Sequence, residues 1–210
     1  MQQQKILKKR GKFIVLEGID KCGKTTQQTL LRNKINNSVL IDFPNPITFT
    51  WELIKSYLNG NISLSPECSH LLFSLNRWEL KSEIEKKLNS GNNIITSRYI
   101  HSGIAYSMAK GVDRKWCEVV DMIQGNSKTK LPKPDLIIFL DINPKTSSGR
   151  EGFGLDINEK KSLQKKVRKA FMEILKGLDN VVIINCNGFS KSNIHKKIMS
   201  AVGKIVNIKE

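Results

Sequence analysis

The amino-acid sequence predicts an α/β fold of three layers, in which a central parallel sheet of five strands is flanked by helices. Two observations predict this fold. Five short apolar runs, rich in β-branched residues, recur without polar alternation, which is typical of strands buried on both faces. Segments with helical spacing lie between these runs, and such an alternation favours a parallel sheet with right-handed crossovers.

The elements follow one another in a simple order. The expected strands are 12–18, 39–43, 93–97, 135–142 and 180–186. The expected helices are 25–36, a long helix from Ser65 to about 91, 101–110, 114–124, 159–177 and 190–207. Ligands of such sheets bind beyond the carboxyl ends of the strands. The residues that follow each strand are therefore the candidates for function.

Length and composition suit one domain, because the chain has 210 residues of which 39% are hydrophobic. We expect a flexible basic leader at 1–11 and a single domain over 12–210, with a mobile lid at about 146–158. A transit peptide is the alternative for the leader, and its scarcity of Ser and Arg speaks against it. No apolar run is long enough to span a membrane.

Four scattered cysteines form no C-x-x-C pair, which argues against a zinc site and against a disulfide framework. A reducing cytoplasm is the simplest location. The net charge of +16 has two explanations, which are a nucleic-acid partner and a lysine-rich surface around a site for phosphate esters. The lysines are spread along the chain and arginine is scarce, so the second explanation is favoured.

The stretch "GIDKCGKT", residues 18–25, fits the pattern G-x-x-x-x-G-K-[ST] between a predicted strand and a predicted helix. This is the context of the phosphate-binding loop of P-loop NTPases, in which glycines turn backbone N–H groups toward an anion. Lys24 can reach the β- and γ-phosphates, and the Thr25 hydroxyl can bind Mg²⁺. The predicted ATP-binding residues are Gly18, Ile19, Asp20, Lys21, Cys22, Gly23, Lys24, Thr25, Thr26 and, from the lid, Arg150. For Cys22, a reactive thiol and a small residue that fits a tight loop both remain open.

Four further stretches suit a nucleotide that accepts the phosphoryl group, which are 71–79, 97–106, the rigid lead-in to a strand at 131–135 and the glycine-containing loop at 149–156. In "LLFSLNRWE" (71–79), Phe73 and Arg77 are four residues apart and share one helix face, where they can stack on a base and hydrogen-bond to it. The alternative is that Phe73 and Trp78 belong to the core and Arg77 to the surface. In "SRYIHSGIAY" (97–106), Arg98 stands where a strand ends and Gly103 allows close approach.

The chain strongly resembles the thymidylate kinases. The resemblance rests on "FIVLEGIDKCGKTTQ", "DFP", "LLFSLNRWE", "RYIHSGIAYSMAKG", "LPKPDLIIFL" and the lid, in the family's order over about residues 12–175. It implies transfer of the γ-phosphoryl group of ATP to dTMP with Mg²⁺ as cofactor, and a homodimer.

The resemblance also implies residue roles. Asp20 contacts the 3′-hydroxyl of dTMP, Lys21 acts like an arginine finger supplied in cis, and Arg98 holds the acceptor phosphate. Phe73 stacks on thymine and Arg77 donates to its carbonyl. The implied catalytic set is Asp20, Lys21, Lys24 and Arg98. The implied dTMP-binding set is Asp20, Phe43, Phe73, Arg77, Arg98, Ser102, Gly103, Tyr106 and Glu159. Thr25 would bind the metal, with Asp20 and Ser97 acting through water. Gln164 matches a family position without a role that the sequence explains.

Three positions depart from the family pattern. Pro46 stands where the family has an Arg that binds the acceptor phosphate, Ser97 where it has an Asp, and Ile157 where it has a lid Arg. An active kinase would need Arg98 and lysines such as Lys55 to supply the missing charge. The alternatives are a nucleotide binder with impaired or altered-acceptor activity and, less favoured, a nucleic-acid-binding protein.

Overall fold

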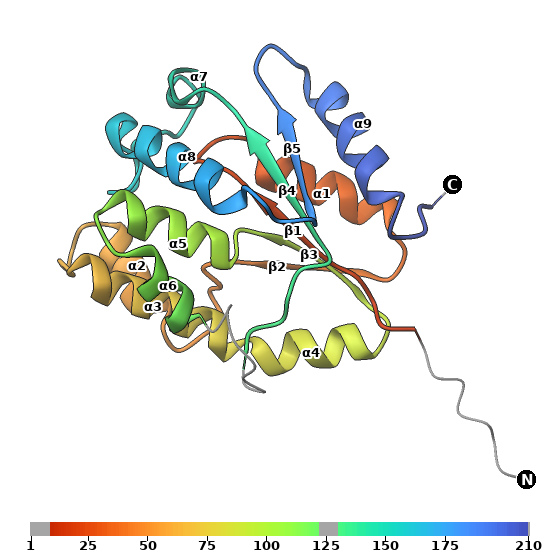
Figure 1. Cartoon of the computed structure of the whole chain (residues 1–210), viewed down its shortest axis with the longest axis horizontal. Helices are drawn as coiled ribbons and strands as arrows, with labels where there is room; N and C mark the ends of the chain where they lie inside the picture. Colours follow the sequence, from red (N-terminus) through yellow and green to blue (C-terminus); the bar gives the residue numbers. More distant parts are fainter. Residues whose placement is uncertain (1–8, 122–129, 210) are drawn as a thin grey trace, which may run out of the picture.

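A central parallel sheet of five strands organises the molecule, as the sequence predicts. A computed structural model describes residues 9–121 and 130–209 (Figure 1). The strands are β1 (Phe13–Glu17), β2 (Ser38–Asp42), β3 (Asn93–Ser97), β4 (Leu136–Asp141) and β5 (Val181–Asn185). Their order is β2-β3-β1-β4-β5, and all pairs are parallel.

Burial separates the central strands from the edges. Every residue of β1 is buried, and β3 and β4 are buried over nearly their whole length. The edge strands β2 and β5 are half-exposed, so the expected burial on both faces is wrong for these two. An edge strand has a neighbour on one side only, and its apolar run does not reveal its place in the sheet.

Helices cover both faces of the sheet. Figure 1 shows α1 and α9 on one side and α5 and α8 on the other, with α2, α3 and α6 stacked outside α5. The helices are α1 (Lys24–Lys34), α2 (Trp51–Leu58), α3 (Pro66–Glu79), α4 (Lys81–Asn89), α5 (Ile100–Ala109), α6 (Arg114–Val120), α7 (Pro144–Ser148), α8 (Lys161–Leu175) and α9 (Lys191–Val202). None of the helices in the described part of the chain is long and apolar enough to cross a membrane.

The long helix expected from Ser65 is wrong, because two helices meet at Leu80. Its N-terminal prediction is confirmed, since the Ser65 hydroxyl accepts from the N–H of Cys68 at 3.1 Å. Leu80 is buried, and its N–H bonds the carbonyl of Arg77 at 3.3 Å in a tighter final turn. The chain thus changes direction at a buried leucine. A break between helices at such a residue could not be predicted, because no Gly or Pro marks it in the sequence.

Two short helices, α2 and α7, were not expected. The apolar residues Trp51, Ile54 and Leu58 have the helical spacing that could have revealed α2. The helix α7 starts where the Asn143 side chain accepts from the N–H of Lys145 at 2.9 Å, and it occupies the first part of the expected lid.

Two further expectations, the N-terminal leader and the helix at 114–124, extend beyond the described residues. The leader at 1–11 lies mostly outside the described residues, but Arg10 contacts Asp135 at 2.7 Å and the N–H of Gly11 bonds Leu88 O at 2.8 Å. The helix expected over 114–124 is helical to Val120, and its last residues fall in 122–129, outside the described residues.

Candidate active site

The phosphate loop folds tightly around the Lys24 ammonium group. Lys24 Nζ donates to the carbonyls of Gly18 at 3.0 Å and Ile19 at 2.8 Å. Gly18 has a φ of 145°, and a Cβ there would lie 2.7 Å from Cys22 Sγ and 2.8 Å from Leu140 O. Glycine is therefore required at 18 both by the backbone conformation and by the close approach of β4.

Burial lowers the pKa of Lys24, and the nearby Arg98 lowers it further. Cys22, Asp20 and Glu17 act in the opposite direction. The loop therefore holds a concentrated positive charge with little access to bulk water. Such a charge is worth more against a phosphate than the same charge on the surface would be.

Asp20 connects this loop to the expected acceptor residues. Its Oδ1 accepts from Arg98 Nη2, and its Oδ2 accepts from Tyr106 Oη at 2.6 Å and Gln164 Nε2 at 2.7 Å. Burial alone would raise the pKa of Asp20, but Arg98, Lys24 and the two neutral donors together hold it below its usual range. The carboxylate is therefore ionised at neutral pH, and both oxygens have protein partners.

Gln164 has a structural role that the sequence did not explain. Its side chain is fully buried, and besides Asp20 Oδ2 it bonds the N–H of Asp20 at 2.9 Å and the carbonyl of Asn158 at 2.8 Å. One amide thus joins α8, the phosphate loop and the end of the lid. The signal available in the sequence was a polar residue on the buried face of an amphipathic helix.

Glu17 is a second polar residue that sequence reasoning missed. It ends β1 with no exposed surface, and its carboxylate accepts from the N–H groups of Tyr99 at 3.0 Å and Ser102 at 3.1 Å and from the Ser102 hydroxyl. It therefore caps the start of α5 and ties the acceptor pocket to the strand that carries the phosphate loop. Burial opposes its charge, but His101, Ser102 and Arg98 lower its pKa.

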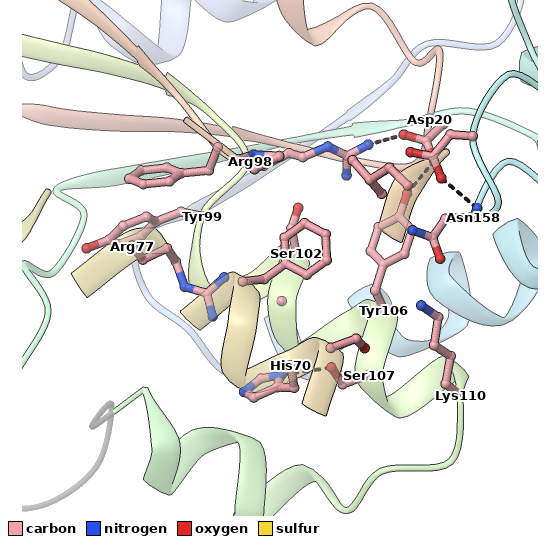
Figure 2. A pocket seen from close by; sticks show the side chains of 17 residues that line it. Asp20, His70, Arg77, Arg98, Tyr99, Ser102, Tyr106, Ser107, Lys110 and Asn158 are labelled. Carbon is pink, nitrogen blue, oxygen red and sulfur yellow. Dashed lines mark hydrogen bonds and ion pairs between the residues drawn. The ribbon is translucent and has the colours of Figure 1, made fainter. Parts of the chain in front are cut away.

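A pocket of about 700 Å³, counting the solvent at its mouth, opens beside Asp20 and Arg98 (Figure 2). Seven of the residues expected to contact dTMP line it together with Asp20. They are Phe43, Phe73, Arg77, Arg98, Ser102, Gly103 and Tyr106. The pocket also takes in His70, Tyr99, Ser107, Lys110, Asp156 and Asn158, which the sequence analysis did not select.

Phe73 and Arg77, the two residues expected to contact the base, both line the pocket. Arg77 is 3% exposed, so its alternative placement on the surface is wrong. Its Nη2 donates to both oxygens of Asp121 at 2.8 Å. Phe73 is half-buried, lines the pocket and meets Tyr57 edge-on at 6.2 Å. Its ring is therefore not fully buried in the core and is accessible from the pocket.

The lid residues gather at the phosphate loop. Lys21, whose φ is 55°, places Nζ 3.6 Å from Glu159 Oε1, and its carbonyl accepts from Arg150 at 2.6 Å. Glu159 also accepts from the N–H groups of Gly154 at 2.7 Å and Leu155 at 3.1 Å. Glu159 therefore stabilises the lid through backbone hydrogen bonds. It does not line the pocket, whereas Asp156 and Asn158 do.

The departures from the family pattern fall in different surroundings. Pro46 is exposed and does not line the pocket, whereas Ser97 is buried at the end of β3 opposite Leu16. Lys55 is exposed, 3.9 Å from Glu52, and it does not line the pocket either. The lysine that lines the pocket is Lys110, which donates to Tyr57 Oη at 2.8 Å.

Comparison with known proteins agrees with this geometry. The thymidylate kinase family model matches residues 16–198. The thymidylate kinase of Dictyostelium discoideum is 38% identical over 191 residues, which covers 89% of this chain and 82% of the relative. That of Schizosaccharomyces pombe is 37% identical over 210 residues, covering 96% and 95%. The solved structure of the Candida albicans thymidylate kinase superposes with a TM-score of 0.84 at 33% identity, covering 95% of this chain and 97% of the other. This chain belongs to the thymidylate kinase family.

Proposed function

We propose that this protein transfers the γ-phosphoryl group of ATP to dTMP, giving dTDP and ADP. The observation that carries the proposal is the Asp20–Arg98 pair, which stands where the phosphate loop meets a pocket with an aromatic ring and an arginine at its far end. Membership of the thymidylate kinase family supports the same activity.

The reaction is an in-line transfer without a covalent enzyme intermediate. An oxygen of the acceptor phosphate attacks the γ-phosphorus, the bond to the β–γ bridging oxygen breaks, and ADP leaves. Lys24 stabilises charge on the donor phosphates, and Arg98 does so on the acceptor side. Asp20, held ionised by its partners, accepts from the 3′-hydroxyl and fixes the sugar. Tyr106, whose hydroxyl donates to Asp20, would lie at the sugar's 2′ position and disfavour ribonucleotides.

The oxygen donors near the phosphate loop fit Mg²⁺. This ion takes few protein ligands and keeps waters beside substrate phosphates, so it needs no carboxylate cage. Thr25 would bind the ion directly, while Asp20, whose oxygens are both engaged, and Ser97 would act through water. When bound, Mg²⁺ neutralises charge on the β- and γ-phosphates.

An active kinase is the better interpretation of the departures. Arg98 and the base pocket keep their partners, and Lys110 brings a cation to the pocket that position 46 does not. We therefore place impaired or altered-acceptor activity second. The nucleic-acid interpretation explains the net charge but not the pocket. All four cysteines are free, which supports a reducing cytoplasmic location.

A homodimer is proposed through the outer face of α2, α3 and α6. Large apolar side chains are exposed there, including Leu71 (48%) and Leu75 (53%), which lie one turn apart on α3, and Val119 (61%) on α6. We expect light scattering to give twice the chain mass and Leu75→Glu to give the monomer, because a buried unpaired carboxylate is costly. A monomeric wild-type protein at micromolar concentration contradicts the proposal.

The acceptor assignment is tested by Phe73→Ala. Stacking of a base on an aromatic side chain is worth about 1–3 kcal/mol, so the KM for dTMP should rise roughly tenfold or more. Phe189→Ala is the matched control, because Phe189 is 42% exposed beside α9 and does not line the pocket. Steady-state ADP formation with dTMP measures both. An unchanged KM in Phe73→Ala shows that the base lies elsewhere.

A further inference from the structure

Asp121 lies behind the base end of the pocket, directly after α6, and no sequence pattern pointed to it. Its carboxylate has no exposed surface. Besides the two bonds from Arg77 Nη2, it accepts from the Ser74 hydroxyl at 2.5 Å. Two side chains of α3, Ser74 and Arg77, and the side chain of Asp121 therefore meet in one buried polar cluster.

The guanidinium of Arg77 is held from a second side by Gly103 on α5. A Cβ added at Gly103 would lie 2.8 Å from both Nη1 and Nη2 and 3.0 Å from Cζ. Only a residue without a side chain permits this approach. Among residues 9–121 and 130–209, Nη1 has no hydrogen-bond partner, and Arg77 lines the pocket (Figure 2). In this part of the chain Nε has no partner either, but it is buried. The two restraints thus leave Nη1 as the guanidinium nitrogen available to a ligand in the pocket.

The neighbouring histidine does not compete for the carboxylate. His70 Nε2 lies 3.8 Å from Asp121 Oδ2, and its Nδ1 bonds Ser107 Oγ at 2.8 Å. Burial lowers the pKa of His70 more than Asp121 raises it, and Arg77 lowers it further, so this histidine is neutral at pH 7. The charge of Asp121 is therefore available to Arg77, which a buried guanidinium requires.

We propose that Asp121 is a positioning residue that sets acceptor specificity through Arg77. By occupying Nη2 it presents Nη1 to the base, so that the pocket selects bases with a carbonyl oxygen at that edge and rejects bases with an amino group there. Arginine has no acceptor, so an amino group against Nη1 would leave two donors unpaired. Sites built to hydrogen-bond a substrate group discriminate strongly for this reason. The inference rests on the proposed function, because it takes the pocket as the site of the base.

The test compares dUMP with dCMP, whose bases carry a carbonyl and an amino group, respectively, at the same ring position. Calorimetric titration gives the dissociation constant of each for the full chain. We expect the wild type to prefer dUMP. Three variants should each reduce this preference about tenfold or more. Asp121→Asn offers a single acceptor, Arg77→Lys has no second guanidinium nitrogen to present to the base, and Gly103→Ala displaces the guanidinium.

Asp141→Asn is the matched control. Asp141 also accepts two bonds from a guanidinium, from Arg168 Nε at 2.6 Å and from Arg168 Nη2 at 2.8 Å, and it does not line the pocket. Its loss should leave the dUMP preference unchanged, which separates positioning from the general loss of an ion pair. Thermal unfolding of every variant reports stability separately.

A folded Asp121→Asn variant with the wild-type preference overturns the proposal, whatever its melting temperature. If Asp121→Asn does not fold, Gly103→Ala is the deciding variant, because it moves the same guanidinium and keeps the carboxylate. A wild-type preference for dUMP in Gly103→Ala also overturns the proposal. Equal binding of dUMP and dCMP by the wild type has the same consequence. ADP formation is followed in parallel. Selective binding without phosphoryl transfer would count against the proposed function alone.

Discussion

Lys24→Met should lower kcat for phosphoryl transfer by about 10²–10³-fold or more, which is the loss expected when one preorganised donor to developing charge is removed. The structure concentrates this effect in one side chain. Lys24 Nζ lies inside the loop, 2.8–3.0 Å from two of its carbonyls, and its charge is kept out of bulk water. A methionine fills similar volume without charge.

The fold should survive this substitution, because burial lowers the pKa of Lys24 and thus opposes its charged form in the folded state. We expect a melting temperature near that of the wild type together with the loss of ADP formation, because the lost hydrogen bonds to the carbonyls of Gly18 and Ile19 offset the relief of the buried charge. Lys165→Met is the matched control, since Lys165 is exposed on α8, and it should keep wild-type kcat. Near wild-type turnover in Lys24→Met would show that the loop does not hold the donor.

The phosphate loop could be predicted because its information is local. Gly18, Gly23 and Lys24 lie within seven consecutive residues, and a strand and a helix flank them. The pocket could be predicted in part, because Phe73 and Arg77 share a helix face that spacing reveals. In both cases the chemistry follows from residues close together in the chain.

The supporting residues could not be predicted, because their partners are distant in sequence. Asp121 meets Arg77 across 44 positions, and Gln164 meets Asp20 across 144. A buried Glu or Gln in an apolar run is visible in the sequence, but its partner depends on how the helices stack. Glu159, which the resemblance placed at the substrate, instead fastens the lid through the N–H groups of Gly154 and Leu155.

Arg98 has two expected roles. It binds the acceptor phosphate, and it stabilises the ionised form of Asp20. Burial is the largest single effect on the pKa of Arg98 and lowers it, but Asp20 and Tyr106 act in the opposite direction, and the net result is a raised pKa. In turn, Arg98 is the first of the groups that hold the pKa of Asp20 down against burial. Asp20 therefore contributes stability that is present above its unfolded-state pKa, about 3.9, and is lost as the pH falls through its folded pKa.

Arg98→Met should consequently have two effects that can be separated. The kcat with dTMP should fall about 10²–10³-fold, because the acceptor phosphate loses its cation. The melting temperature should fall most at neutral pH, where Asp20 is left ionised and buried with Lys24 as its remaining cation, and the difference from wild type should narrow below about pH 4. Arg98→Lys restores the charge but not the planar guanidinium with its several donors, so it should recover the melting temperature more than kcat. A melting difference that does not change between pH 7 and 3 would mean that Arg98 acts on the acceptor and not through Asp20.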